Sequence, residues 1–414
     1  MSHTENGQSE PVAAASWQHF ADYCFAASPV RDRVASDPAR FIARYADLHH
    51  LGDATADPLA QAIVDGRVAR ADFEQALHHG MTSLDRPATE LVEFFATVDR
   101  VPTCLDQSAV DRGALLMRRL PPTVTVAYGM ISGFTFAAIN PNSAIALSLN
   151  NAIVESTHRR YVETMKYVHD TYSDGGRERS SPAFATACRV RLVHAFVRTE
   201  IERHVDWNTA AYGSPINMFQ VLIAASVSGT WMIPFAEQAG YRFSSAEKSD
   251  IAEFTAYLAL MQGVPESHVL RTFDDWSELV YGCLATSPLP LPDDVAAAQR
   301  VLRPLIEDGF PVSPNPRLTT WFNDYVLETT RQAFGDAMCD EWAIRPGRSG
   351  ATARRALSWT NRALAACHRT ELLRPLHDRC CDRYWAVSVP NMIQRVTGHL
   401  DIDYSDTAAV AGAA

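Results

Sequence analysis

One histidine stands between two arginines in the stretch "CRVRLVHAFVRTEIERH", which runs from Cys188 to His204. On a helix, Arg191, His194 and Arg198 fall at positions i, i+3 and i+7, within about 60° of one face. The aliphatic side chains around the histidine favour its neutral form, whose free ring nitrogen can bind a metal ion. An imidazole, an aliphatic wall and nearby cations are the groups that bind the iron, the ring and the propionates of haem.

The same residues also fit a simpler interpretation. A histidine on an apolar helix face, beside arginines that pair with other groups of the protein, is more often a structural core residue than a ligand. The residue types and their spacing by themselves favour this simpler interpretation. His194 is therefore a candidate haem ligand whose role the pattern alone leaves open.

A second group of polar residues lies in "HRRYVETMKYVHD", residues 158–170. On a helix, Arg160, Glu163 and Thr164 share one face. Because this segment follows a long uncharged one, we expect that face to turn toward the core, where a buried arginine needs an anionic partner such as a haem propionate. Glu163 is then the candidate catalytic acid or base. The alternative is a plain ion pair between Arg160 and Glu163 on a surface helix.

Helical spacing dominates the segments that must position these residues. Apolar side chains recur three and four residues apart in "DPARFIARYADLHHL", "ADFEQALHHGM" and "ATELVEFFATVDRV", whereas alternating runs typical of strands are few. We therefore predict an all-α fold. Since no clear linker divides the chain, residues 16–400 are predicted to form one domain, with a helical C-terminal part over 280–400 and disordered tails at 1–15 and 401–414.

Two long segments carry no charged side chain, one between Arg119 and Glu155 and the other between Asp206 and Glu237. Each is long enough to cross a membrane, but prolines, asparagines and other polar residues interrupt both. We therefore expect buried helices of a large core and no stable membrane insertion. Helices that are apolar on all sides also suit the walls of a pocket for an apolar cofactor and substrate.

The composition points to a protein that acts on a small molecule. The chain of 414 residues has a formal net charge of −11, which argues against nucleic acid as a partner. Its eight cysteines are scattered, without the spacing of a zinc finger or of a covalent haem attachment motif. They are predicted to be reduced thiols, and because "MSHTENGQSEPVAAASW" shows no export signal, we expect a cytoplasmic location.

Several motifs between residues 50 and 275, taken together, resemble the family of rubber oxygenases (latex clearing proteins) and MpaB-type oxygenases, a group of helical haem-b proteins. The segments that carry the resemblance are "GDATADPLAQAIVDG" (52–66), "FFATVDRVPTCLDQSAVDRGALLMRR" (94–119), Arg160 with Thr164, "RVRLVHAFVR" (189–198), "WNTAAYGSPINMF" (207–219) and "FTAYLALMQGVP" (254–265). Their order and spacing are more specific than any one of them. Beyond about residue 280 the resemblance is loose.

The resemblance implies a globin-like helical core that encloses haem b, with additional helices around it. It implies that His194 is the proximal ligand of the iron and that Arg191 and Arg198 accompany it on the same helix. Arg160 and Thr164 match an arginine and a threonine that lie at the haem edge in this family. The implied activity is that of an oxidoreductase in secondary metabolism, with dioxygen and an apolar small molecule as its substrates.

The chain departs from the rubber-cleaving members at the residues expected on the other side of the iron. Those members carry a lysine just before the threonine, where this chain has Glu163. They also have a distal glutamate, whereas no carboxylate stands near Ala144 here, and Glu155 is the nearest. The resemblance therefore implies the scaffold and the cofactor but not rubber cleavage.

Other site classes fit the sequence less well. A haem-thiolate enzyme needs a glycine-rich cysteine loop that "FGDAMCDE" (334–341) does not provide. A di-iron oxygenase needs a pair of E-x-x-H motifs, of which only "ESTH" (155–158) is present, and a zinc hydrolase needs an H-E-x-x-H that is absent. We hypothesise a haem-b oxygenase or oxidase. Two alternatives are left open, a non-catalytic haem sensor or carrier and a non-haem di-iron oxygenase. The oligomeric state and the choice between C=C cleavage, hydroxylation and desaturation are open as well.

Overall fold

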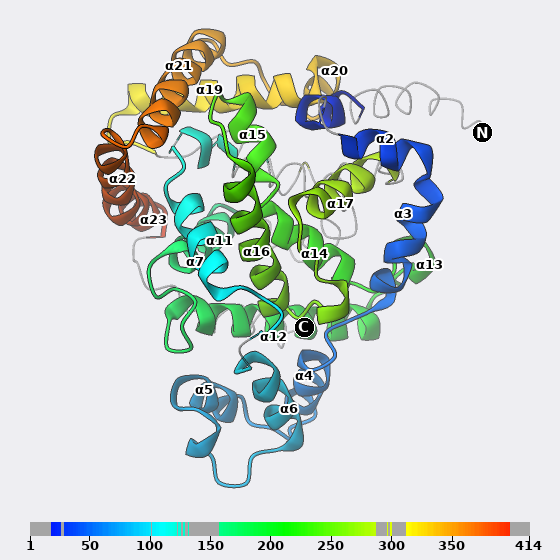
Figure 1. The fold of residues 1–414 in the computed structure, drawn as a ribbon. Helices are drawn as coiled ribbons and strands as arrows, with labels where there is room; N and C mark the ends of the chain where they lie inside the picture. The colour runs from blue at the N-terminus through cyan, green and yellow to red at the C-terminus, as the bar shows by residue number, and fades with distance from the viewer. Residues whose placement is uncertain are drawn as a thin grey trace, which may run out of the picture.

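The structure is a computed structural model that describes residues 18–25, 29–100, 102–121, 123–125, 127–128, 131, 157–286, 296, 299 and 312–397. Across these residues every regular element is helical and no strand occurs, which confirms the predicted all-α fold (Figure 1). The predicted tails at 1–15 and 401–414 and most of the first uncharged segment lie outside the described residues. The proposed boundaries of the single domain stay a prediction.

The described helices follow one another along the chain from Pro29 to Thr397. Their bounds are α2 Pro29–Ser36, α3 Pro38–Tyr45, η1 Ala46–His50, α4 Ala56–Val64, α5 Arg70–His79, η2 Met81–Ser83, α6 Thr89–Val98, α7 Gln107–Arg118, α11 Thr157–Tyr172, α12 Pro182–His204, α13 Thr209–Tyr212, α14 Met218–Val227, α15 Met232–Gln238, α16 Ser245–Met261, η3 Glu266–His268, α17 Phe273–Thr286, α19 Pro316–Phe334, α20 Asp336–Glu341, α21 Gly350–Arg369, α22 Arg374–Arg383, η4 Tyr384–Ser388 and α23 Val389–Thr397. The segments η1, η2 and η3 are 3₁₀ turns, and η4 is a π-helical turn.

Helices α7 and α16 pack closely against each other in the centre of the protein. Gly113 on α7 makes this approach possible, because a Cβ at that position would lie 2.3 Å from the backbone oxygen of Asp250 on α16. Beside this contact, Arg112 holds the Asp250 carboxylate with two hydrogen bonds of 2.8 and 2.9 Å. The pair forms a rigid base against which α11 and α14 pack.

The second uncharged segment forms α13, α14 and α15. Asn217 begins α14 with a capping box, in which its side chain and that of Gln220 bond each other's backbone amides. Among the described residues, one helical segment, Met218–Gln238, is long and apolar enough to cross a membrane, and 83% of its most apolar stretch is buried inside the protein. This burial agrees with the predicted core helices.

The C-terminal helices form a layer along one side of this core (Figure 1). Helix α19 packs on α21, and α23 packs on α11. Between α22 and α23, Trp385 of η4 stacks on His169 at 5.0 Å and on Tyr172 at 5.6 Å between ring centroids. The π-helical turn therefore attaches the C-terminal layer to α11.

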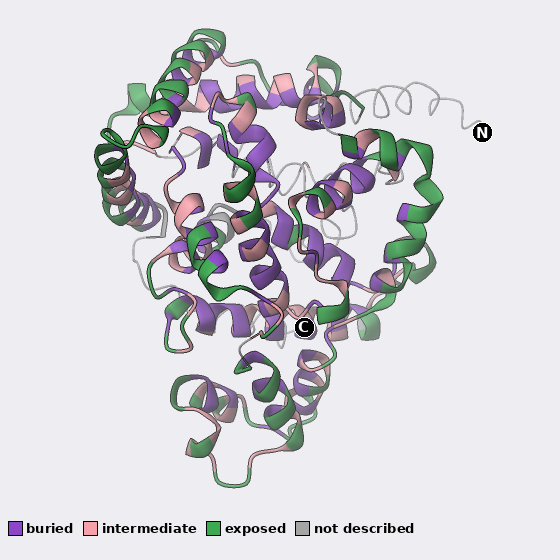
Figure 2. Cartoon of the chain, in the orientation of Figure 1, coloured by how far each residue is buried: buried purple, intermediate pink, exposed green. Residues whose placement is uncertain are grey.

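Helices α4, α5 and α6 form a small lobe beside α12, at the bottom of Figure 1. Figure 2 shows that the central helices are largely buried, whereas the lobe has exposed outer faces. Helix α4 is the part of the lobe that packs most directly on α12. The lobe is thus attached to the helix that carries His194.

Candidate functional site

Helix α12 positions three of the predicted site residues. Its start is fixed at Ser181, whose hydroxyl accepts a hydrogen bond from the amide of Phe184, and Pro182 occupies the first helical position. The helix then runs for 23 residues. Two adjoining faces of the helix differ in burial: Arg191 and Arg198 are buried, whereas His194, about 40–60° around the helix from them, is half-buried.

Arg191 is paired with Asp53, at the start of the α4 segment. Its Nε and Nη2 atoms each donate a hydrogen bond of 2.8 Å to the carboxylate, and the two side chains are only 2% and 4% exposed. Its guanidinium also lies over the ring of Phe94 at 5.1 Å. Burial alone would raise the pKa of Asp53, but the charge and hydrogen bonds of Arg191 hold this pKa below its usual value.

Arg198 makes the second link to the same segment. It forms an ion pair with Asp57 and donates hydrogen bonds to the carbonyl oxygens of Pro215, at 2.9 Å, and Ile216, at 2.6 Å. Burial raises the pKa of Asp57 to about 6 although the charge of Arg198 opposes this. Arg198 thus joins α4, α12 and the loop before α14.

These contacts bear on our expectation for the two arginines. We expect Arg160 to be the first candidate for the haem propionates, with Arg191 and Arg198 next. In the structure the hydrogen bonds of Arg191 and Arg198 go to Asp53, Asp57 and backbone carbonyls of the protein itself. Their role in the structure is to dock the lobe on α12. The motif "GDATADP" contains the partners of the two arginines, which we did not predict. Its two aspartates are four residues apart, and Arg191 and Arg198 are seven residues apart on α12.

His194 lies in an apolar stripe that adjoins the two arginines on α12. Val190, Val193, His194 and Val197 fall on one side of the helix, and all four are half-buried, between fully buried residues such as Leu192 and Ala195. Valines in a protein of this size are usually buried, so an apolar stripe left partly open offers a contact surface. The structure therefore places a single imidazole within an accessible aliphatic surface.

Helix α11 packs against α12 and carries the other predicted site residues. Glu163 is buried with 8% of its surface exposed, while Thr164 is exposed. Arg160 falls in the first turn of α11, and its side chain lies outside the described residues, as does Glu155. The structure thus brings together the two helices predicted to face the cofactor, with one buried carboxylate and one accessible hydroxyl.

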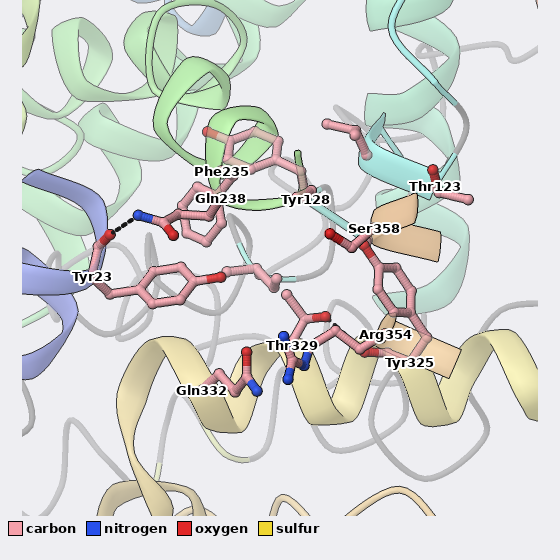
Figure 3. Close-up of a pocket in the computed structure, with 14 residues that line it drawn as sticks. Tyr23, Thr123, Tyr128, Phe235, Gln238, Tyr325, Thr329, Gln332, Arg354 and Ser358 are labelled. Atoms are coloured by element: carbon pink, nitrogen blue, oxygen red, sulfur yellow. Dashed lines mark hydrogen bonds between the residues drawn. The ribbon is translucent and has the colours of Figure 1, made fainter. Parts of the chain in front are cut away.

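Neither of the two described cavities is lined by α11 or α12. One cavity, of about 80 Å³, lies among α15, α19 and α21. Figure 3 shows the aromatic and polar side chains that line it, which include Tyr23, Tyr128, Phe235, Tyr325 and Arg354. The other, of about 600 Å³, lies among the segments around Phe25, Pro234 and Phe273. The first is too small for a tetrapyrrole, since cofactor sites usually enclose roughly 300 Å³ or more.

A separate group of possible metal ligands lies at the junction of α21 and α22. It consists of His368, His377 and Asp378, whose nearest ligand atoms all lie within 4.8 Å of one another. Burial lowers the pKa of His377, which favours the neutral ring. This group shares no residue with the predicted haem site, and sequence reasoning did not identify it because its histidines are nine residues apart without a metal-binding motif.

Comparisons with known proteins bear on the whole fold and on α7 to α21. Residues 117–370 match the family described as "ER-bound oxygenase mpaB/B'/Rubber oxygenase, catalytic domain". The chain is 25% identical over 240 residues to a rubber oxygenase of Streptomyces sp. (strain K30), a match that covers 55% of this chain and 57% of that protein. The chain therefore spans little more than half the length of that relative.

A solved structure supports the fold. A latex clearing protein in the closed state superposes with a TM-score of 0.59 over 82% of this chain and 91% of that one, at 18% sequence identity. At this identity the similarity establishes the helical architecture. The family match covers α11 and α12, and therefore every site residue predicted from the sequence, but not Asp53, Asp57, His377 or Asp378. With well over half of its length matched, the chain belongs to the MpaB-type and rubber oxygenase family.

Proposed function

We propose that this protein is a haem-b-dependent oxygenase that acts on an apolar small molecule, with His194 as the proximal ligand of the iron. The observation that carries the proposal is the half-open valine stripe around one imidazole on α12, within the segment that matches the oxygenase family. Haem is apolar over most of its surface and binds one such imidazole in many oxygen-handling proteins. The accessible face of α12 suits it.

The residues present fit this cofactor. His194 would provide the nitrogen ligand, and Val190, Val193 and Val197 would provide apolar contacts. Arg191 and Arg198 have carboxylate partners in the protein, so Arg160 at the start of α11 is the first candidate to bind the propionates. We propose that α11 and α12 hold the two sides of the group.

When bound, haem b supplies an iron centre that activates dioxygen. His194 would hold the iron through one ring nitrogen, and the valine stripe would pack against the apolar ring beside it. We propose that the uncharged segments 120–154 and 207–236 keep water from the substrate. The buried carboxyl of Glu163 is placed to hold and release a proton at an Oε atom, and the Thr164 hydroxyl can donate a hydrogen bond on the same helix. Their roles are positioning and proton transfer.

An apolar substrate is supported by the residues of α14 and α15. Met218 to Ile223 form an unbroken buried run, yet Ala224 is exposed in the same helix. Helix α14 holds no charged side chain, so a polar substrate would find no ionic partner along it. Since this chain has Glu163 where rubber-cleaving members carry a lysine, we propose a small molecule in place of polyisoprene.

A visible absorption spectrum of the purified full-length chain tests the cofactor. We expect a Soret band that survives desalting and is lost in His194→Ala. The matched control is His49→Ala, which removes another half-buried imidazole, one that stacks on Phe219 at 4.2 Å, and should keep the band. A colourless protein from haem-supplied cells, or an unchanged band in His194→Ala, would contradict the proposal.

Oxygen uptake then distinguishes an oxygenase from a sensor or carrier. An oxygenase should consume dioxygen only when an apolar substrate, such as a panel of small alkenes and polyketides, is added. Stable gas binding without consumption across that panel would identify a carrier instead.

A further inference from the structure

We propose that His368, His377 and Asp378 form a binding site for a divalent transition metal ion, separate from the haem site, between α21 and α22. Asp378 Oδ1 lies 3.0 Å from His377 Nδ1 and 3.9 Å from His368 Nδ1. Ligand atoms around a tetrahedral zinc ion lie about 3.4 Å apart. The three groups are therefore close enough together for small side-chain shifts to bring one atom of each to a zinc ion.

His368 is oriented as metal-binding histidines usually are. Its Nε2 lies 3.0 Å from Glu247 Oε1 on α16, so a neutral ring carries its proton on Nε2 and a lone pair on Nδ1. That Nδ1 atom is buried and has no hydrogen-bond partner. It faces the Asp378 oxygen at 3.9 Å, which is too far for a hydrogen bond. Both atoms, His368 Nδ1 and Asp378 Oδ1, are electron-pair donors to a metal. A cation bound between them would give His368 Nδ1 the partner that it lacks.

Neighbouring side chains also position the other two ligands, Asp378 and His377. Arg119, the C-cap residue directly after α7, donates a hydrogen bond of 2.7 Å to Asp378 Oδ2, which leaves Oδ1 to contact the two histidines. The ring of His377 is fully buried, and its Nε2 lies 3.6 Å from the Cys381 thiol. A thiol donor at Nε2 leaves the proton of His377 on Nδ1, where it bonds Asp378. Metal binding would displace this one proton to solvent.

The identity of the ligands selects the kind of metal. Two imidazoles and one carboxylate suit zinc and other first-row divalent ions and are unsuited to calcium or magnesium, which prefer oxygen ligands. Three protein ligands leave a fourth position for water. Since the site connects α21 and α22 to α16 through Glu247 and to α7 through Arg119, bound metal should fasten the C-terminal layer to the core.

Zinc titration of the full-length chain, freed of metal with a chelator and desalted, tests the site. We expect one zinc ion per chain by calorimetry and by elemental analysis, and a rise of several degrees in the thermal midpoint. His368→Ala and Asp378→Asn should each weaken zinc binding at least about 100-fold and abolish the thermal shift. Glu247→Gln, which keeps all three ligands and a side chain able to complete the capping box, should weaken it about 10-fold.

Two controls separate this site from other histidines. The double variant His78→Ala/His79→Ala removes two exposed imidazoles and should bind zinc as the unmodified chain does. His194→Ala should lose haem and keep zinc, so that failure of either proposal is visible without the other. The proposal is overturned if the unmodified chain binds no zinc, or if binding of one equivalent persists in both ligand variants while circular dichroism shows them folded.

Discussion

The two faces of α12 differ in how their polar groups are used. On the buried face, Arg191 and Arg198 have carboxylates or carbonyls of the protein as partners. On the adjoining face, about 40–60° around the helix, His194 lies among valines that stay partly accessible. Neighbouring residues of one helix can therefore differ in role: the two arginines hold the fold together, and the histidine between them lies in an apolar, half-buried stripe.

The largest expected effect comes from Arg191→Met, which removes the buried ion pair between Arg191 and Asp53. This change leaves the Asp53 carboxylate buried without its partner, which costs about 3–5 kcal/mol of unfolding free energy. Urea denaturation followed by circular dichroism measures the loss. The Soret absorbance per folded chain should stay unchanged, because Arg191 serves the fold.

The double variant Asp53→Asn/Arg191→Met is the control for this pair. It removes both charges, so it should recover part of the lost stability. A variant Arg191→Met that keeps its stability but loses haem would instead place Arg191 at the cofactor, as the sequence first suggested.

The sequence predicted the fold class and the family better than the side-chain partners of individual residues. Helical spacing was enough for the all-α fold, and the motif around His194 located the helix that matches the family. The pairing of Arg191 with Asp53 was not predictable, since it joins residues 138 positions apart and depends on how α4 docks. Likewise His368 and His377 come together only because α21 turns back into α22.

The buried carboxylate of Glu163 on α11 offers the next comparison. If Glu163 transfers a proton during turnover, Glu163→Gln should lower kcat about 100-fold while the Soret band is retained. The pH profile of kcat should also lose one limb. Glu178→Gln, at an exposed position just beyond the same helix, is the control and should behave as the unmodified enzyme. An unchanged kcat in Glu163→Gln would assign this side chain a structural role.

The dependence of stability on pH tests the buried pair of Asp53 and Arg191. Asp53 has a pKa below its usual value of 3.8 in the folded chain, so the folded state binds fewer protons than the unfolded state in acid. The pair therefore stabilises the folded chain above about pH 4, and this stabilisation is lost as the pH falls through the pKa of Asp53 in the folded state. The free energy of unfolding falls by at most about 1.4 kcal/mol per pH unit over this range. In Arg191→Met the sign reverses, because burial alone raises the pKa of Asp53 and stability then falls as pH rises. Denaturation between pH 3 and 6 measures both slopes, and parallel slopes would contradict the assignment.

The smallest effect is expected at Arg189, which lies on the same helix two residues before Arg191. It pairs with Glu74 at 2.6 Å, but the two side chains are 19% and 29% exposed. Water and salt screen such a pair, so Arg189→Met should cost only about 0–1 kcal/mol, and less still at high salt. The same denaturation assay compares it directly with Arg191→Met. Because both substitutions remove one arginine from one helix, equal losses would show that helix propensity or net charge, and not burial of the pair, sets the stability of the α4 docking site.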